Sequence, residues 1–262
     1  MEFVNIELLQ QRKGEIARFF NEQKPFRYVV IENFFLHNAA EKIYNKYPLP
    51  DAQEWNATTY IDQRRKFIKN KFSETDLFNK VFQELHSTEL IAYLQEISGI
   101  SDLLCDPELF GAGLHQSITG AHLNVHIDYN IHPITKLHRR LNLIVYMNKD
   151  WKDEYEGHIE FWDYTSDEKR FLTRYAPSFN RCVIFETNEH SFHGHPKPLN
   201  TPQGINRKSL AVYYYTKNRA VSETAPEHNS VFINTEGISG QWKRFNSGLA
   251  AFIERIKNEM LG

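Results

Sequence analysis

Residues 111–216 decide the fold of this chain, and their four most informative segments read GAGLHQSITGAHLNVHIDYN (111–130), RRLNLIVYMNKDW (139–151), EHSFHGHP (189–196) and RKSLAVYYYT (207–216). Short apolar runs alternate here with polar and turn residues, a pattern that predicts several β-strands. Nine of the twelve histidines of the chain also lie in this stretch, between His115 and His195. The stretch therefore combines a β-rich core with many groups that can bind a metal.

Helical spacing dominates the chain before this stretch. Apolar residues from Ile6 to Phe20 predict one amphipathic helix, and a short strand follows at residues 28–31. Asn38 is placed to cap a second helix, which ends before Pro48. Residues 75–97 predict two more helices, interrupted near Ser87 and ended by Gly99.

Two further regions complete the expected fold. Residues 51–71 are polar and irregular, so we expect a loop that carries the basic cluster Arg64-Arg65-Lys66. Helical spacing returns after Gly237 and predicts a terminal helix. Between these regions we expect strands near residues 123–127, 141–147, 158–162, 182–185 and 209–215.

These elements predict an α+β fold with a mainly β core, either a barrel or a two-sheet jelly roll, flanked by N-terminal helices and a C-terminal helix. We expect one domain over residues 1–262, helical to about residue 100, with its core at about 105–217 and its closing helix at about 238–262.

Composition narrows the functional class. The formal charge of −2 offers no reason to expect nucleic acid as a partner, and no apolar run reaches the about 18 residues of a membrane helix. The polar N-terminus is not a signal peptide, and two cysteines, Cys105 and Cys182, are too few for a disulfide framework. We therefore expect a soluble cytoplasmic protein with reduced thiols. No feature of the sequence indicates an oligomeric state.

A His-x-Asp pair, His126 and Asp128, is the centre of the candidate site. Residues two apart on a strand face the same side, so both side chains can point into a barrel. A third ligand would come from another strand, and His193, with His195 beside it, lies downstream. Two imidazoles and one carboxylate form the facial triad of non-haem Fe(II) oxygenases. The dipeptide pattern alone is common by chance, as surface or core residues.

Arg207 adds a second requirement to the same region. It lies 14 residues after His193 in an apolar, aromatic run, and Ser209 shares its strand face. A guanidinium buried in a barrel needs an anionic partner, which a dicarboxylate would supply through paired hydrogen bonds. The alternative is an ordinary surface ion pair.

Together, the order His126-Ile127-Asp128, His193, Arg207-Lys208-Ser209 and the intervening string YMNKDW (146–151) resemble the prolyl 4-hydroxylase-type branch of the 2-oxoglutarate/Fe(II)-dependent dioxygenases. The segment PFRYVVIENF (25–34) is similar to the first strand of such proteins, less specifically.

The resemblance implies that the β core is a double-stranded β-helix (jelly roll, cupin-like), and it implies a role for each matching residue. His126, Asp128 and His193 would bind iron, His193 being favoured over His195 because the family ligand precedes the glycine. Arg207 with Ser209 would anchor the distal carboxylate of 2-oxoglutarate, and Tyr146 would donate a hydrogen bond to it. Either Arg139 or Arg140 would be a basic residue on the substrate side.

The implied activity is that of a 2-oxoglutarate- and Fe(II)-dependent dioxygenase that hydroxylates an unactivated C–H bond and releases succinate and CO2, with ascorbate as a further candidate cofactor. A prolyl peptide is the first expected substrate. Gln116 stands where many protein prolyl hydroxylases have Tyr, and Glu156-Gly157 stands where Gly-Gly is usual. A small molecule or a sugar is therefore the alternative substrate.

Several alternatives stay open. The basic loop 129–140 is either a lid over the site or a solvated loop, and His122 is expected to face the cavity because it lies four residues before His126. A jelly-roll module that binds metal or sugar without turnover would share the fold. A zinc hydrolase would use the same three ligands but has no need for Arg207.

Overall fold

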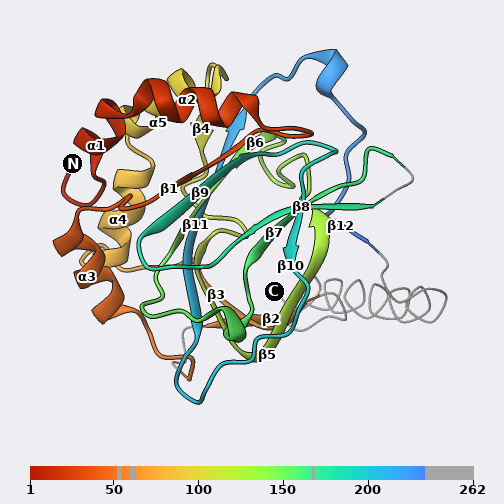
Figure 1. The fold of residues 1–262 in the computed structure, drawn as a ribbon. Helices are drawn as coiled ribbons and strands as arrows, with labels where there is room; N and C mark the ends of the chain where they lie inside the picture. Colours follow the sequence, from red (N-terminus) through yellow and green to blue (C-terminus); the bar gives the residue numbers. More distant parts are fainter. Residues whose placement is uncertain (52–54, 59–62, 167–168, 234–262) are drawn as a thin grey trace, which may run out of the picture.

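The computed structural model describes residues 1–51, 55–58, 63–166 and 169–233. Within them, twelve strands form one curled antiparallel sheet, in which the order along the main path is β1-β9-β6-β11-β5-β10-β7-β8 (Figure 1). The path strands are β1 (Tyr28–Ile31), β5 (Gly113–Ile127), β6 (His138–Tyr146), β7 (Ile159–Asp163), β8 (Arg170–Tyr175), β9 (Arg181–Glu186), β10 (Phe192–His195) and β11 (Arg207–Thr216).

Strand β5 makes the sheet curl. Its first half pairs with β11, where Ser209 lies opposite His115, and its second half pairs with β10, where His193 lies opposite His126. Gly120, at φ +77°, lies between the two halves and adopts a backbone conformation that L side chains rarely accept. Because one long strand serves both halves, the sheet closes over itself. The expected jelly roll is confirmed.

The α-helices of the described residues pack on the outer face of one half of the sheet (Figure 1). They are α1 (Ile6–Gln11), α2 (Lys13–Glu22), α3 (His37–Lys46), α4 (Leu77–Leu85) and α5 (Thr88–Ser98). Alternation along the strands separates two cores. Val145 and Ile184 face the helices, whereas Tyr146, Val183 and Phe185 face the interior of the curl.

The predicted helices are confirmed with three local differences. The helix expected from Ile6 to Phe20 is two helices, since the backbone of Arg12 leaves helical geometry between α1 and α2. Helix α3 begins at His37 with Leu36 at its N-cap, so Asn38 is not the cap. The break at Ser87 is as predicted, because its side chain accepts a hydrogen bond from the Leu90 amide and starts α5. Gly99 ends α5 in the left-handed region.

The loop prediction for residues 51–71 is wrong. Two strands, β2 (Asn56–Thr58) and β3 (Gln63–Lys69), pair with each other, and β3 also pairs with β5. The segment is too polar to predict a strand by hydrophobic alternation, and it becomes one because β5 offers a free edge. The terminal helix expected at about 238–262 lies outside the described residues.

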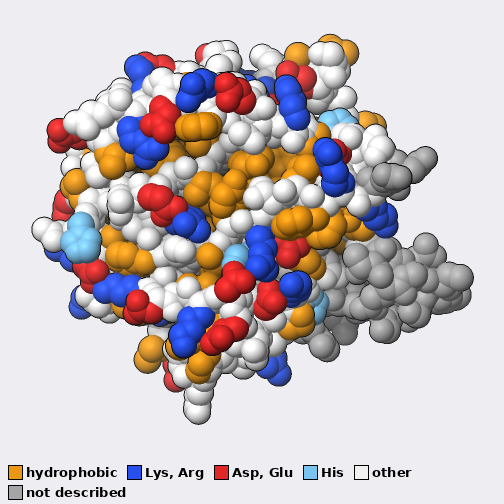
Figure 2. Space-filling model, viewed as in Figure 1, with side chains coloured by type: hydrophobic (Ala, Val, Ile, Leu, Met, Phe, Trp, Pro, Cys, Tyr) orange, Lys and Arg blue, Asp and Glu red, His pale blue; other side chains and the backbone are white. Residues whose placement is uncertain are grey.

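Shorter elements complete the described fold. Strand β4 (Leu104–Cys105) pairs with β11, β12 (Val231–Phe232) pairs with β5, and single helical turns occur at η1 (Asp153–Tyr155) and η2 (Val221–Glu223). Both cysteines are free. Over the described ranges, no helix has the length and apolar character needed to cross a membrane. Figure 2 shows basic and acidic side chains interspersed on the face in view, in keeping with the small net charge.

The end of α3 is tied to the sheet by Tyr47. Its buried hydroxyl lies 2.9 Å from the carbonyl oxygen of His115 and 2.8 Å from that of Ser209, two residues that face each other across β5 and β11. We expect Tyr47→Phe to lower the free energy of unfolding by about 1–3 kcal/mol, because it leaves buried polar groups without this donor. Urea denaturation measures the change.

Tyr44→Phe is the matched control. Tyr44 lies near the end of the same helix, its ring packs against Phe179, and it is only partly buried. An equal loss of stability in both variants would show that the two hydrogen bonds at Tyr47 contribute nothing.

Candidate metal centre and adjoining cavity

The three predicted metal ligands meet at one end of the curled sheet. His126 lies near the end of β5, His193 lies opposite it on β10, and Asp128 follows β5 directly. One ligand atom from each residue lies within 4.8 Å of the other two. The Asp128 carboxylate oxygens are 3.5 Å from His126 Nε2 and 3.6 Å from His193 Nε2. This set can hold one metal ion on a triangular face.

Backbone carbonyls set the tautomer of both histidines. His126 Nδ1 lies 2.9 Å from the carbonyl oxygen of Asn124, and His193 Nδ1 lies 2.8 Å from that of Ser191. A carbonyl oxygen only accepts, so each Nδ1 carries the proton and each Nε2 presents its lone pair toward Asp128. This is the arrangement in which imidazole binds a metal.

Asp128 is held from behind by two side chains of β6. Its Oδ2 accepts a 2.7 Å hydrogen bond from Asn142 Nδ2 and lies 3.2 Å from Arg139 Nη2. Arg139 is itself buried between the rings of Tyr129 and Tyr213, at 4.5 and 3.5 Å from their centroids. The carboxylate is therefore oriented before any metal binds.

Electrostatics keep Asp128 and His193 in their metal-binding protonation states. Burial opposes ionisation of Asp128, but the charge of Arg139 and the nearby imidazoles outweigh it and hold its pKa well below the usual value. Burial, with the neighbouring His126, lowers the pKa of His193 to about 4. A neutral imidazole and an ionised carboxylate are the forms that coordinate metals.

Arg207, Ser209 and Tyr146 line the same cavity, deeper inside the sheet. Arg207 donates from Nε to the Gly157 carbonyl oxygen at 2.7 Å and from Nη2 to the Tyr146 hydroxyl at 3.2 Å. No carboxylate in the described part of the chain forms an ion pair with it. A partly buried guanidinium that faces a cavity and has no acidic partner among the described residues has the donor groups to bind an anionic ligand.

Gly157 explains why the Glu156-Gly157 turn matters. A Cβ at this position, where φ is +74°, would lie 2.3 Å from Leu199 and 3.1 Å from Cδ of Arg207. Glycine is therefore needed for the arginine to lie against the turn.

Lys66 is the cavity residue that sequence reasoning missed. It lies on β3 opposite Ser117, and it lines the cavity together with Arg207 and Asp128. Burial lowers its pKa to about 8, with Asp128 opposing the shift. Its sequence context, a basic cluster, suggested a solvated loop; only the pairing of β3 with β5 turns this side chain inward.

The expectations for other residues have mixed outcomes. Arg139 supports Asp128 and does not line the cavity, and Arg140 faces the opposite side of β6, so neither is the expected basic residue on the substrate side. His122 does not line the cavity, whereas Leu123 and His195 do. Gln116 is buried and bonds to the Pro48 carbonyl oxygen, away from the cavity.

Two β-bulges account for these differences. On β6, Arg139 and Leu141 oppose the consecutive residues Tyr215 and Tyr214, so Arg140 is an extra residue and Arg139 turns inward. On β5, His126 and Leu123 oppose His193 and His195, so the inward face changes from odd to even numbers between them. Position along the sequence alone misplaces every residue beyond such a bulge.

The bulge in β5 brings backbone close to Gly194. A Cβ there would lie 2.8 Å from the carbonyl oxygens of both Leu123 and Asn124, so only glycine allows His193 to approach β5.

Two further residues that contact the metal ligands were also missed from the sequence. Asn142 is a single polar residue inside an apolar strand, a pattern that could have indicated a functional role. The sequence gives no such indication for Phe232, whose ring stacks on that of His126 with the ring centroids 4.9 Å apart.

The basic loop 129–140 is fastened by its own contacts. Lys136 pairs with Glu227 at 2.8 Å, and the Tyr129 hydroxyl bonds to that of Tyr215 at 2.7 Å. No residue from 129 to 140 lines the cavity. The structure therefore favours a packed loop over a positively charged lid.

Comparison with known proteins agrees with this geometry. Residues 112–215 match the 2OG-Fe(II) oxygenase superfamily. The fold is similar to a prolyl-4-hydroxylase from Pseudomonas putida, at 13% identity and a TM-score of 0.53 over 77% of this chain and 98% of that one. No curated protein matches the sequence significantly.

Two other solved structures have a similar fold. A prolyl hydroxylase from Trichoplax adhaerens, in complex with a hypoxia inducible factor oxygen degradation domain peptide fragment, has 15% identity and a TM-score of 0.56 over 80% of this chain and 92% of that one. HygX from Streptomyces hygroscopicus, with nickel and 2-oxoglutarate bound, has 12% identity and a TM-score of 0.51 over 82% and 96%. At these identities the similarity establishes the shared fold.

Arg139 gives a test of the support behind Asp128. We expect Arg139→Gln to weaken Fe(II) or Mn(II) binding by about 10- to 100-fold, because the carboxylate loses the charge that orients it and keeps it ionised. Anaerobic metal titration measures the affinity. The control is Arg181→Gln on β9, which removes the ion pair between Arg181 and Glu32. Equal affinity in both variants would mean that Arg139 only fills space.

Proposed function

We propose that this chain is a member of the 2OG-Fe(II) oxygenase superfamily, binds Fe(II) through His126, Asp128 and His193, and hydroxylates an unactivated C–H bond of its substrate. One observation supports this proposal above the others. A His/Asp/His set with metal-binding tautomers and an arginine without an acidic partner face one cavity. A zinc hydrolase would need the first feature and not the second.

The residues present fit both ligands. The three metal ligands use one triangular face of an octahedron, so the opposite face stays available to cosubstrate and dioxygen. Arg207 and Ser209 lie on the same face of β11, and Tyr146 lies opposite Ser209 on β6. These three groups would hold the distal carboxylate of 2-oxoglutarate by charge-assisted hydrogen bonds.

Bound Fe(II) would supply the oxidising chemistry, in which the C–H substrate, dioxygen and 2-oxoglutarate together give the hydroxylated substrate, succinate and CO2. The protein holds the reactants in place. Arg139 and Asn142 orient Asp128, the Gly157 turn positions Arg207, and the apolar residues Ile144 and Ile159 also line the cavity.

A prolyl peptide is the first candidate substrate, because the order and spacing of the site residues resemble the prolyl 4-hydroxylase-type branch. Lys66 favours a second candidate, a small molecule with an anionic group. Asp128 is paired with Arg139, and 2-oxoglutarate would occupy Arg207. Lys66 then remains as a cation on the cavity wall. A carboxylate or phosphate on the substrate would neutralise it.

Arg207 provides the test of cosubstrate binding. We expect Arg207→Met to weaken 2-oxoglutarate binding by about 10- to 100-fold while metal affinity changes little, because the arginine would hold the distal carboxylate and is not one of the three metal ligands. Anaerobic titration of the Fe(II)-loaded protein, followed by the weak visible charge-transfer band of the chelate, measures this affinity.

His126→Ala is the matched comparison, since it removes a metal ligand and should abolish metal binding and the band together. Parallel loss of metal and cosubstrate in Arg207→Met would show that the arginine is structural. A wild-type protein that retains zinc tightly and never develops the band would favour a zinc hydrolase.

The substrate is tested by succinate release. Prolyl peptides, free amino acids and sugar nucleotides are compared, each as a neutral and an anionic member. We expect Lys66→Met to raise KM about tenfold for the anionic member of the active pair and much less for the neutral one. An equal change in both would place Lys66 outside substrate binding.

A further inference from the structure

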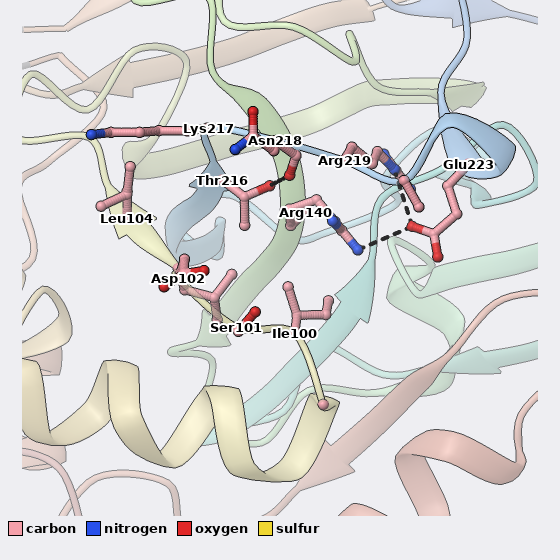
Figure 3. A pocket seen from close by; sticks show the side chains of 13 residues that line it. Ile100, Ser101, Asp102, Leu104, Arg140, Thr216, Lys217, Asn218, Arg219 and Glu223 are labelled. Atoms are coloured by element: carbon pink, nitrogen blue, oxygen red, sulfur yellow. Dashed lines mark hydrogen bonds and ion pairs between the residues drawn. The ribbon is translucent and has the colours of Figure 1, made fainter.

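A second concave region lies on the outer side of the sheet, between the end of α5 and the segment that follows β11 (Figure 3). Two adjoining cavities of about 670 and 560 Å³ share Arg140, Arg219 and Glu223 among their lining residues. This region, here called the outer groove, is separated from the metal centre by β6, because Arg139 faces inward and Arg140 faces outward.

The outer groove contains two buried arginines and one shared acid. The side chains of Arg140 and Arg219 are 9% and 4% exposed, and Glu223 Oε2 lies 3.2 Å from Arg140 Nη2 and 3.5 Å from Arg219 Nε. Two guanidinium groups and one carboxylate leave one positive charge uncompensated. Glu223 is itself 47% exposed and extends from a single helical turn, η2.

The hydrogen-bonding capacity of these arginines is also incomplete. The Nε atom of Arg140 is buried and has no hydrogen-bond partner in the described part of the chain. The buried Nε of Arg219 has only the 3.5 Å ion-pair contact with Glu223, and its Nη1 donates to the Arg139 carbonyl oxygen at 3.3 Å. Burial, and then the charge of Arg219, lower the pKa of Arg140, which shows that the surroundings disfavour its charged form. An unsatisfied, buried guanidinium costs free energy unless an anion joins it.

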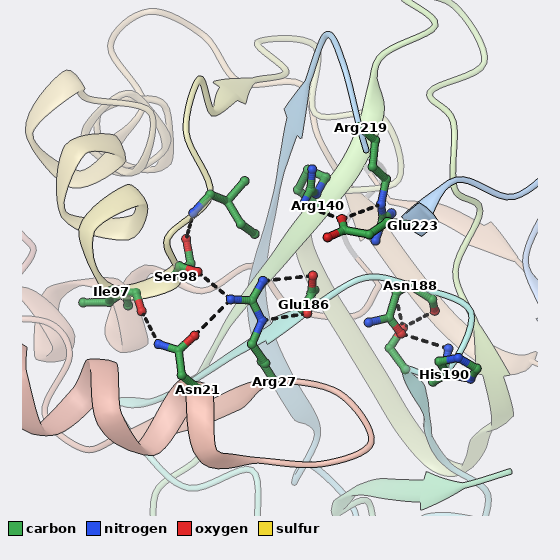
Figure 4. Close-up of polar contacts among 12 residues, drawn as sticks. Asn21, Arg27, Ile97, Ser98, Arg140, Glu186, Asn188, His190, Arg219 and Glu223 are labelled. Atoms are coloured by element: carbon green, nitrogen blue, oxygen red, sulfur yellow. Dashed lines mark hydrogen bonds and ion pairs between the residues drawn. The ribbon is translucent and has the colours of Figure 1, made fainter. Parts of the chain in front are cut away.

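Arg27, in the same groove, shows what a satisfied arginine looks like (Figure 4). It makes two hydrogen bonds to Glu186, at 2.9 and 3.0 Å, and further bonds to Asn21 Oδ1 at 3.0 Å and the Ser98 carbonyl oxygen at 2.6 Å. Arg27 therefore needs no ligand, whereas Arg140 and Arg219 compete for one acid. The remaining charges of the first cavity, Asp102 and Lys217, have opposite signs, and Glu189 of the second cavity lies 3.1 Å from His228 Nε2.

We propose that the outer groove binds the oxyanion group, phosphate or carboxylate, of a small molecule between Arg140 and Arg219. Planar guanidinium forks match both anions through paired hydrogen bonds. Glu223 occupies this position in the absence of ligand and moves toward solvent when the anion binds. The cavity volume is in the range of small-molecule sites, so the remainder of the ligand lies along Ile100 and Leu104.

Calorimetric titration of the full chain at constant ionic strength tests the site, with inorganic phosphate, pyrophosphate and citrate as probes and chloride as the blank. We expect saturable binding of at least one oxyanion. Arg140→Gln and Arg219→Gln should each weaken it by about tenfold or more, because each removes a charge-assisted contact. The probe that binds more tightly identifies the phosphate or the carboxylate class.

Glu223→Gln makes the test independent of any folding defect in the arginine variants. It removes the competing carboxylate, so we expect tighter oxyanion binding by about threefold to tenfold. Arg181→Gln, which removes a cation that lines neither cavity, should bind as the wild type does. Arg207→Met should also retain binding, which separates this site from the metal cavity.

Absence of saturable binding to all three probes would overturn the proposal. Binding that persists unchanged in Arg140→Gln and Arg219→Gln, or that does not tighten in Glu223→Gln, would overturn it as well. Because none of these readouts depends on turnover, the test is independent of the proposed hydroxylase activity.

Discussion

The rest of this structure depends on the pairing of β5 with other strands along both of its edges. Its first half bonds to β11, its second half bonds to β10, and β3 and β12 bond to the edges that remain. A strand that belongs to both halves of a curled sheet brings together residues distant in sequence. His126 and His193 become direct neighbours in this way, and Lys66 comes to line the same cavity as Arg207.

The curled sheet encloses charged side chains, so each of them needs a partner inside it. A carboxylate buried inside the sheet would be costly alone, and Asp128 is tolerated because Arg139 and Asn142 contact it from behind. Arg139 in turn is stabilised between two tyrosine rings. Among the described residues, Arg207 has only neutral partners. The interior therefore has a carboxylate where a metal cation can bind and a guanidinium where an anion can bind.

Side chains alternate between the two faces of β6, so the strand places different groups at the metal centre and on the outer face of the sheet. Along β6, inward residues support Asp128 and line the cavity, while outward residues pack against the helices until the bulge at Arg140. There the outward side chain reaches the outer groove and meets Arg219 (Figure 3). One extra residue in a strand thus separates a group that orients a metal ligand from a group that faces a second site.

The sequence by itself determined what depends on neighbouring residues. Period-two spacing placed His126 with Asp128 and Arg207 with Ser209, and capping residues placed the break between α4 and α5, because these features require only local geometry. It could not determine what depends on pairing across the sheet. The bulges in β5 and β6 decided the sides of His122, Arg139 and Arg140, and the open edge of β5 made a strand of β3 and turned Lys66 inward. A bulge adds one residue and reverses the facing of all that follow, and only the partner strand reveals it.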